Sequence, residues 1–262
     1  MIKKILVIDI GNTNIVCGLY LNSNKLTSES MINTFRISSD RIKTSDEYYV
    51  LIKNLSPAMD IDYICVSSVV PSIGRTIEHM IKRFFSVPYL FVTGNTKLDM
   101  KFPMQDTTFI GADLIVNAYA AWQKYQTNCI VCDLGTATTV QLVGQNGSFN
   151  GTAILPGLVT GAHNLFEKAA LLSNIQLESP KTTLGLTTKD ALLSGLIKGH
   201  AFALDGFINE IKTIFSDFTP ITTVATGGIS TLVSEQSKNI DIVDKSLTLD
   251  GLFLITKKIL VT

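Results

Sequence analysis

Arginine is scarce in this chain, and there is no excess of charge of either sign. Only Arg36, Arg41, Arg75 and Arg83 occur, and the 22 basic residues are balanced by 22 acidic ones. A protein that binds the nucleic-acid backbone normally carries an excess of basic residues. The composition therefore argues against nucleic acid as a partner.

Long uninterrupted apolar runs are also missing. A membrane-spanning helix needs about 18 or more apolar residues in succession, and no segment approaches that length. The apolar run that follows Lys3 and Lys4 stops at Asp9, with no small-residue cleavage site nearby, so it does not read as a signal peptide. We therefore expect a cytoplasmic protein without a membrane partner.

Cysteine and histidine are few, which limits metal and redox chemistry. Cys129 and Cys132 have the spacing of half a zinc or redox site, but they lie in a strand-like run, where residues three apart point to opposite faces. No second pair follows, so we interpret them as buried structural thiols. The scattered His79, His163 and His200 form no Ser–His–Asp pattern and indicate packing or surface roles.

What is present is the composition of a well-packed globular protein. Hydrophobic residues make up 46% of the chain and charged residues 17%, which excludes intrinsic disorder. Apolar strand-like segments are separated by stretches of helical period, most clearly residues 112–125, 190–215 and 249–259. Such mixing of strands and helices predicts an α/β fold.

Three strand-like segments each run into a turn of small residues: Lys4–Asn14, Cys129–Thr139 and Thr223–Ser230. The first two share the pattern Asp-x-Gly, and Asp9 lies 124 residues before Asp133, close to half the chain length. This spacing predicts an internal duplication. We divide it into an N-terminal half, 1–115, and a C-terminal half, 116–262.

The two Asp-x-Gly turns have the residues that a phosphate-binding turn needs. Glycine allows close approach, backbone N–H groups bind anions, and hydroxyls add donors. The preceding aspartate suits a metal ion held against phosphates, and Gly227-Gly228 offers a further glycine-rich edge for adenosine. One such turn is equally typical of an ordinary hairpin, but two copies at half-chain spacing favour a nucleotide site. We expect the halves to face each other across a nucleotide cleft.

Asp113 begins an apolar helical stretch, with Asn117 four residues on and so on the same face. Two interpretations remain open. The carboxylate either caps the helix or accepts a proton from an attacking hydroxyl group.

Several short motifs follow one another along the chain: Asp9–Val16, Val66–Pro71, Gly111–Asp113, Asp133–Thr139, Ile154–Gly157, Thr187–Thr188 with Ser194–Gly195, and Ala225–Gly228. Their order resembles that of type III pantothenate kinases, members of the acetate kinase, heat-shock chaperone, sugar kinase and actin superfamily. The resemblance runs from residue 4 to about residue 252. It implies two duplicated ribonuclease H-like, or actin-like ATPase, domains.

The resemblance implies a homodimeric enzyme that uses ATP to phosphorylate pantothenate to 4'-phosphopantothenate, the first step of coenzyme A synthesis. Magnesium would accompany ATP, a monovalent cation (K+ or NH4+) would bind Asp133, and Asp113 would accept the proton. The nucleotide would contact Asp9, Ile10, Gly11, Asn12, Thr13, Asn14, Ile15, Val16, Thr136, Gly227 and Gly228. Pantothenate would contact Phe102, Gly111, Ala112, Asp113, Leu114 and Thr188.

Two departures from the family pattern concern pantothenate. Leu114 stands where the family usually has arginine, and Phe102 is the nearest candidate for a family tyrosine. Loss of a charge-assisted hydrogen bond costs about 1.5–3 kcal/mol, or roughly 10- to 150-fold in binding. We expect weaker pantothenate binding unless Lys101 or a partner subunit supplies the charge.

Two other functions fit the same motifs. One is a non-catalytic accessory or regulatory protein like the related Bvg accessory factors. The other is a kinase of the same superfamily that acts on another small hydroxyl compound.

Overall fold

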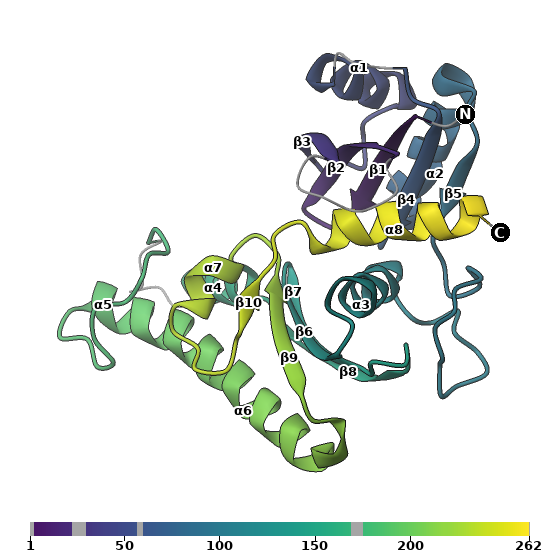
Figure 1. Cartoon of the computed structure of the whole chain (residues 1–262). Helices are drawn as coiled ribbons and strands as arrows, with labels where there is room; N and C mark the ends of the chain where they lie inside the picture. Colours follow the sequence, from purple (N-terminus) through teal and green to yellow (C-terminus); the bar gives the residue numbers. More distant parts are fainter. Residues whose placement is uncertain (1–2, 23–29, 57–59, 169–174, 262) are drawn as a thin grey trace. The chain divides into compact units, whose positions relative to one another are not determined.

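The computed structural model describes residues 3–22, 30–56, 60–168 and 175–261, and the chain divides into two compact units (Figure 1). Unit 1 contains Met1–Gln123 together with Leu247–Thr262, and unit 2 contains Lys124–Ser246. This division differs from the expected halves in two respects. Most of helix α3, Ala112–Tyr125, belongs to unit 1, and the C-terminal helix α8, Leu247–Val261, returns to unit 1.

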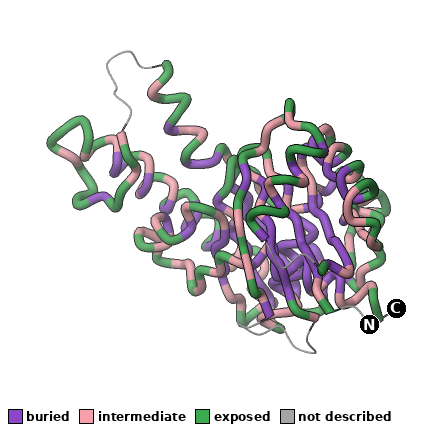
Figure 2. Tube along the Cα trace, turned by 90° about the horizontal axis from the view of Figure 1, so that it is seen from above, coloured by how far each residue is buried: buried purple, intermediate pink, exposed green. Residues whose placement is uncertain are grey.

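Unit 1 is built on a five-stranded sheet with the order β3-β2-β1-β4-β5. The first three strands form an antiparallel meander, while β4 and β5 continue the sheet in parallel with β1. The central strands β1 and β4 consist mostly of buried residues, the class drawn in purple in Figure 2. The strands are β1 (Lys4–Ile10), β2 (Asn14–Leu21), β3 (Met31–Ser38), β4 (Tyr63–Ser68) and β5 (Tyr89–Phe91).

Helices cover both faces of this sheet. Leu6, Ile8 and Ile10 of β1 pack in one apolar core with α1 (Ser45–Leu55) and α2 (Pro71–Met80). Helix α2 continues as a π turn to Phe85. Alternate side chains of a strand point to opposite faces, so the other face needs its own cover. Helix α8 supplies that cover.

Contacts between distant parts of the chain explain why α8 joins unit 1. The Tyr20 ring stacks on Phe253 with 4.7 Å between centroids, and the Tyr20 hydroxyl donates to Asp250 Oδ1 at 2.7 Å. A Cβ atom at Gly251 would lie 2.6 Å from the Val116 carbonyl oxygen, so glycine lets α8 approach α3 closely. The apolar face of α8 therefore packs within unit 1, and not against the unit 2 sheet that precedes α8 in the sequence.

Unit 2 repeats the sheet of unit 1. Its strand order, β10-β9-β6-β7-β8, has the same succession of antiparallel and parallel pairs when β6 is matched to β1. The predictions of an α/β fold and of an internal duplication are confirmed. The strands are β6 (Asn128–Leu134), β7 (Ala137–Val143), β8 (Phe149–Pro156), β9 (Ile221–Thr226) and β10 (Ile242–Val243).

The helices of unit 2 are α4 (Leu158–Lys168), α5 (Thr188–Leu193), a π turn (Ser194–Lys198), α6 (Gly199–Ile214), a 3₁₀ turn (Ser216–Phe218) and α7 (Ser230–Ser234). Residues 188–214 form one continuous helical run. Among the described residues it alone has the length and composition of a membrane span, with a mean hydropathy of 1.3 over an 18-residue window. Several of its apolar side chains, Leu193, Ile197, Ala201, Leu204 and Ile208, are buried in the core of unit 2.

Candidate nucleotide and acceptor site

The first Asp-x-Gly turn is a tight hairpin at one end of the unit 1 sheet. Residues 11–13 join β1 to β2, and the Gly11 N–H donates to the Asn14 carbonyl at 3.0 Å. The last two residues of the turn are exposed, whereas Ile10 and Ile15 beside it are buried. A rigid pair of strands thus presents a polar backbone turn to solvent.

The second turn, in unit 2, is built in the same way. Residues 135–136 join β6 to β7, and the Gly135 N–H donates to the Ala137 carbonyl at 3.0 Å. Both turn residues are exposed. This turn is one residue shorter than the first, so the repeat is not uniform in length.

Asp9 and Asp133 lie at matching positions of the two sheets. Asp9 is the penultimate residue of β1 and pairs with Val16 on one side and Ser67 on the other. Asp133 is the penultimate residue of β6 and pairs with Thr139 and Thr226. Both carboxylates are partly buried, as oxygen ligands for a hard cation would be.

Gly227 brings the end of β9 close to Asp133. Its φ is +95°, and a Cβ atom there would lie 2.5 Å from the Leu134 carbonyl oxygen and 2.8 Å from Asp133 Oδ1. Only glycine fits this combination of dihedral angle and space. Gly228 is exposed and has open space around it, so the two glycines have different local constraints.

Asp113 is the second residue of α3. Its Oδ1 accepts a hydrogen bond from the Leu114 N–H at 2.9 Å. Burial raises the pKa of the Asp113 carboxyl above its ordinary value, although hydrogen bonds from the backbone N–H groups of Leu114 and of Asp113 itself act in the opposite direction. The bond within the first turn fits a capping role, and the raised pKa fits a proton acceptor, so both interpretations agree with this geometry.

A buried contact fixes the helix that carries Asp113. Asn117, one turn further along α3, accepts a hydrogen bond from the Thr248 hydroxyl of α8 at 2.7 Å. Because α8 is itself anchored to the sheet through Tyr20, the position of Asp113 depends on residues near the C-terminus.

The residues expected to bind pantothenate fall into two groups. Gly111, Ala112 and Leu114 surround Asp113 at the start of α3, and Phe102 lies partly buried in the preceding segment. Leu114 is only 8% exposed, so its side chain packs inside unit 1. The remaining expected residue lies in unit 2.

Thr188 is exposed at the first residue of α5 in unit 2. It contributes to a cavity of about 490 Å³ whose lining is mainly apolar. The lining residues are Leu165, Thr188, Ala191, Leu192, Gly195 and Leu196.

The cysteines are buried free thiols, as interpreted from the sequence. Burial raises the pKa of both Cys129 and Cys132 to about 12, with a further contribution from Asp133 and Asp205 at Cys132, so both thiols stay protonated at neutral pH. His200 Nε2 lies 2.9 Å from the Thr138 hydroxyl, a packing contact behind the second turn.

Sequence reasoning missed two residues that contact the turns from behind. The Ser39 hydroxyl donates to the Gly11 carbonyl at 2.6 Å, and the Thr160 hydroxyl donates to the Thr136 carbonyl at 2.8 Å. Serine and threonine are common after strands and in helices, so the only available signal was their position shortly after β3 and β8.

Comparison with known proteins decides the family. The family model described as type III pantothenate kinase matches residues 5–210. The chain belongs to the type III pantothenate kinase family. Curated relatives with that name are 36–39% identical to it, and one from Exiguobacterium sp. is 38% identical over 259 residues, 97% of this chain and 98% of its own length.

Solved structures agree on the fold. A Campylobacter jejuni protein described as a conserved Baf family transcriptional activator has a TM-score of 0.58 and 21% identity, covering 98% of this chain and all of its own. An Arthrobacter inorganic polyphosphate/ATP-glucomannokinase has a TM-score of 0.54 and 15% identity, covering 98% and 99%. The kinase family and the actin-like fold predicted from the motifs are therefore confirmed.

Proposed function

We propose that this chain transfers the terminal phosphoryl group of ATP to the 4'-hydroxyl of pantothenate, the first step of coenzyme A synthesis. The observation that carries this proposal is membership of the type III pantothenate kinase family, with relatives aligned over 97% of the chain. The partly buried Asp113, with its raised pKa, supplies a group suited to the proton transfer.

The turn of unit 1 is the proposed phosphate loop. Its exposed backbone and the residues around it, from Asp9 to Val16, would contact the nucleotide through N–H groups and hydroxyls. Thr136, Gly227 and Gly228 of unit 2 are the other proposed nucleotide contacts. The open space around Gly228 supports its use as a surface against which a flat base packs.

Two kinds of cation belong to the proposal. Magnesium would accompany ATP and neutralise phosphate charge, and a monovalent cation, K+ or NH4+, would bind Asp133. The fit rests on the partly buried carboxylates of Asp9 and Asp133, each two residues before an Asp-x-Gly turn glycine, since hard cations prefer oxygen ligands.

Asp113 acts as the proton acceptor in this proposal. As the pantothenate oxygen forms its bond to the γ-phosphorus, the bond from that phosphorus to the bridging oxygen of ADP breaks. The hydroxyl proton passes to an Asp113 carboxylate oxygen. Burial raises the proton affinity of this carboxylate, which makes it a better base than an exposed aspartate.

Pantothenate binding is proposed for Phe102, Gly111, Ala112, Leu114 and Thr188. The buried Leu114 provides apolar packing and no charge. The exposed Lys101, or a residue of a partner subunit, would then face the substrate carboxylate.

A homodimer is the proposed assembly. Several large apolar side chains of unit 2 are exposed, and exposed apolar side chains that gather in a patch are typical of a surface that binds another protein. They are Leu165, Leu184, Leu186 and Phe202. A cytoplasmic location, without nucleic acid or membrane as partners, completes the proposal.

The test is a coupled assay for ADP release with and without pantothenate and potassium. We expect turnover that requires pantothenate. No turnover with any hydroxyl compound would favour the accessory-protein function, and much faster turnover of another compound would favour a different kinase. No observation on the fold or the site favours either alternative.

A further inference from the structure

Ser39 contacts the proposed phosphate turn of unit 1 at two points. Ser39 directly follows β3, and its hydroxyl donates to the Gly11 carbonyl at 2.6 Å. Its backbone N–H donates to the Thr13 carbonyl at 3.0 Å. Both ends of the three-residue turn are therefore attached to one serine.

The turn of unit 2 is held in a matching way. Gly157 directly follows β8, the counterpart of β3, and its N–H donates to the Thr136 carbonyl at 3.2 Å. A side chain at Gly157 would collide with the carbonyls of Gly135 and Thr136, so no hydroxyl fits at this position. The hydroxyl instead comes from Thr160, three residues on in α4, and reaches the Thr136 carbonyl at 2.8 Å.

This contact has a direct effect on the direction of the turn N–H groups. In a planar trans peptide the carbonyl and the following N–H point in opposite directions. When the Gly11 carbonyl points toward Ser39, the Asn12 N–H must point away from it. Likewise, when the Thr136 carbonyl points toward Thr160, the Ala137 N–H must point away from it. Fixed N–H groups lower the cost of organising a turn around an anion.

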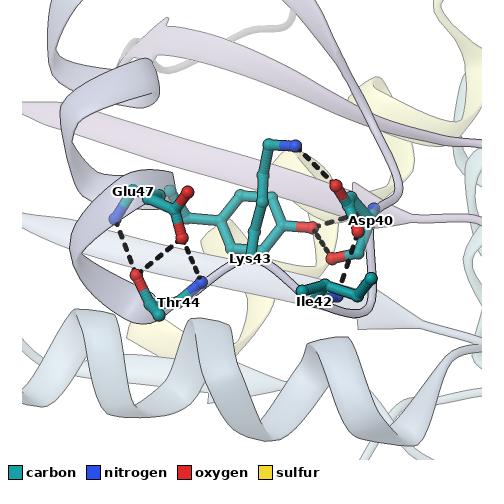
Figure 3. A network of polar contacts seen from close by, with 6 residues as sticks. Asp40, Ile42, Lys43, Thr44 and Glu47 are labelled. Carbon is teal, nitrogen blue, oxygen red and sulfur yellow. Dashed lines mark hydrogen bonds and ion pairs between the residues drawn. The ribbon is translucent and has the colours of Figure 1, made fainter.

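The segment that carries Ser39 is itself braced. The Tyr48 hydroxyl donates to the Asp40 carbonyl at 2.7 Å and accepts from the Asp40 N–H at 3.1 Å. Figure 3 shows Lys43 paired with Asp40, and Thr44 and Glu47 joined in the capping box that begins α1. Tyr48 is fully buried, so this bracing connects the Ser39 segment to the core of unit 1.

We propose that Ser39 and Thr160 are positioning residues for nucleotide binding. They hold the carbonyls of the two turns so that the N–H groups of the turns are presented to the phosphates of ATP. This inference rests on the proposed role of both turns in binding ATP. It adds two residues that do not themselves touch the nucleotide.

The experiment compares hydroxyl-free variants, Ser39→Ala and Thr160→Val, with hydroxyl-retaining variants, Ser39→Thr and Thr160→Ser. The controls are Ser38→Ala and Thr152→Val, which change exposed residues of the preceding strands. Measurements are KM for ATP, KM for pantothenate, kcat, the Kd of a non-hydrolysable ATP analogue, and Tm. Asp9→Asn is the reference variant for the phosphate loop.

We expect each hydroxyl-free variant to raise the KM for ATP and the Kd of the analogue about five- to tenfold, the effect of one hydrogen bond. The KM for pantothenate should stay at the control value, and the hydroxyl-retaining variants should restore ATP binding. A Tm loss with equal changes in both KM values would instead mean a general structural role and overturn the inference.

Asp9→Asn separates this inference from the proposed function. If Asp9→Asn loses ATP binding while Ser39→Ala and Thr160→Val bind ATP like the controls, the positioning role is wrong and the phosphate loop stands. If Asp9→Asn also binds ATP normally, the phosphate loop is wrong and the inference is overturned with it.

Discussion

Asp9 and Asp133 occupy the same register position in two sheets of identical strand order. Each is the penultimate residue of its central strand, between an antiparallel and a parallel neighbour. Equivalent positions need not keep equivalent roles after duplication. The proposal assigns Asp9 to the ATP phosphate loop and Asp133 to a monovalent cation, so the two carboxylates should respond differently to substitution.

Substitution of Asp113 by asparagine tests the proton acceptor. We expect Asp113→Asn to keep ATP binding but to lower kcat by about 10²–10⁴, the usual loss when general-base catalysis is removed. The amide keeps an oxygen that accepts the Leu114 N–H, which makes it a matched replacement. Unchanged turnover would leave Asp113 with only a capping role.

The pH profile gives an independent test of Asp113. Only the deprotonated carboxylate accepts a proton, and burial raises its pKa above the ordinary value of 3.8. Turnover should therefore fall as the pH is lowered through this raised pKa. The residual activity of Asp113→Asn should lack that acidic limb. If turnover of the parent and of Asp113→Asn fell at the same acidic pH, the fall would be due to the titration of another group.

Replacing Asp133 tests the cation site. Asp133→Ala should raise the potassium concentration for half-maximal activity by about tenfold or more, because the loss of one charged ligand costs about 1.5–3 kcal/mol. The measurement is turnover titrated with KCl at saturating ATP and constant ionic strength. A parent protein that is indifferent to potassium would contradict the role proposed for Asp133.

Alanine substitutions at the neighbouring Gly227 and Gly228 give a matched comparison between a stability effect and a binding effect. Gly227→Ala should destabilise the protein by about 1–3 kcal/mol, since it places a side chain at positive φ and against the Leu134 carbonyl. Gly228→Ala meets no neighbouring atom and should leave Tm unchanged while raising the KM for ATP. Thermal unfolding separates the two effects, and equal Tm losses would contradict the difference in local space.

Asp244 provides a prediction about stability and pH. Burial raises the pKa of this carboxyl, but bonds from Lys124 at 2.5 Å, Tyr125 at 2.8 Å and Ser246 outweigh burial and hold the pKa below its ordinary value. A lowered pKa means that the stabilisation is complete above the unfolded pKa of about 3.9 and is lost as the pH falls through the folded pKa.

We therefore expect Asp244→Asn to lower the free energy of unfolding by about 1–3 kcal/mol at pH 7. The difference from the parent should shrink below about pH 4. The exposed Asp217→Asn is the control, and denaturant unfolding across the pH range is the measurement. A difference that persists undiminished at pH 2 would exclude the ion pair as its cause.

The local elements were largely predictable because they depend on patterns of near neighbours. The helical periods at 112–125, 190–215 and 249–259 correspond to α3 (Ala112–Tyr125), to the run 188–214 and to α8 (Leu247–Val261). The strand-turn segments at Asp9 and Asp133 also form as expected. Period and turn chemistry act over a few residues, so one sequence is enough to see them.

The long-range contacts were not predictable from one sequence. An apolar helix period shows that α8 must bury one face but not which sheet it covers, and the deciding contact joins Tyr20 to Asp250, 230 residues apart. The same holds for Ser39 and Thr160, whose hydrogen bonds to the turns depend on where β3 and β8 end. Which residues bind nucleotide and pantothenate stays a prediction.

The return of α8 to unit 1 has a consequence for biosynthesis. Unit 2 is one continuous segment, complete once Ser246 has left the ribosome, whereas the unit 1 sheet lacks its second helical cover until α8 has also emerged. Domains generally fold as they are synthesised. Of the two units, the first to be translated is therefore the last to be finished, and deletion of α8 should harm the unit 1 sheet most.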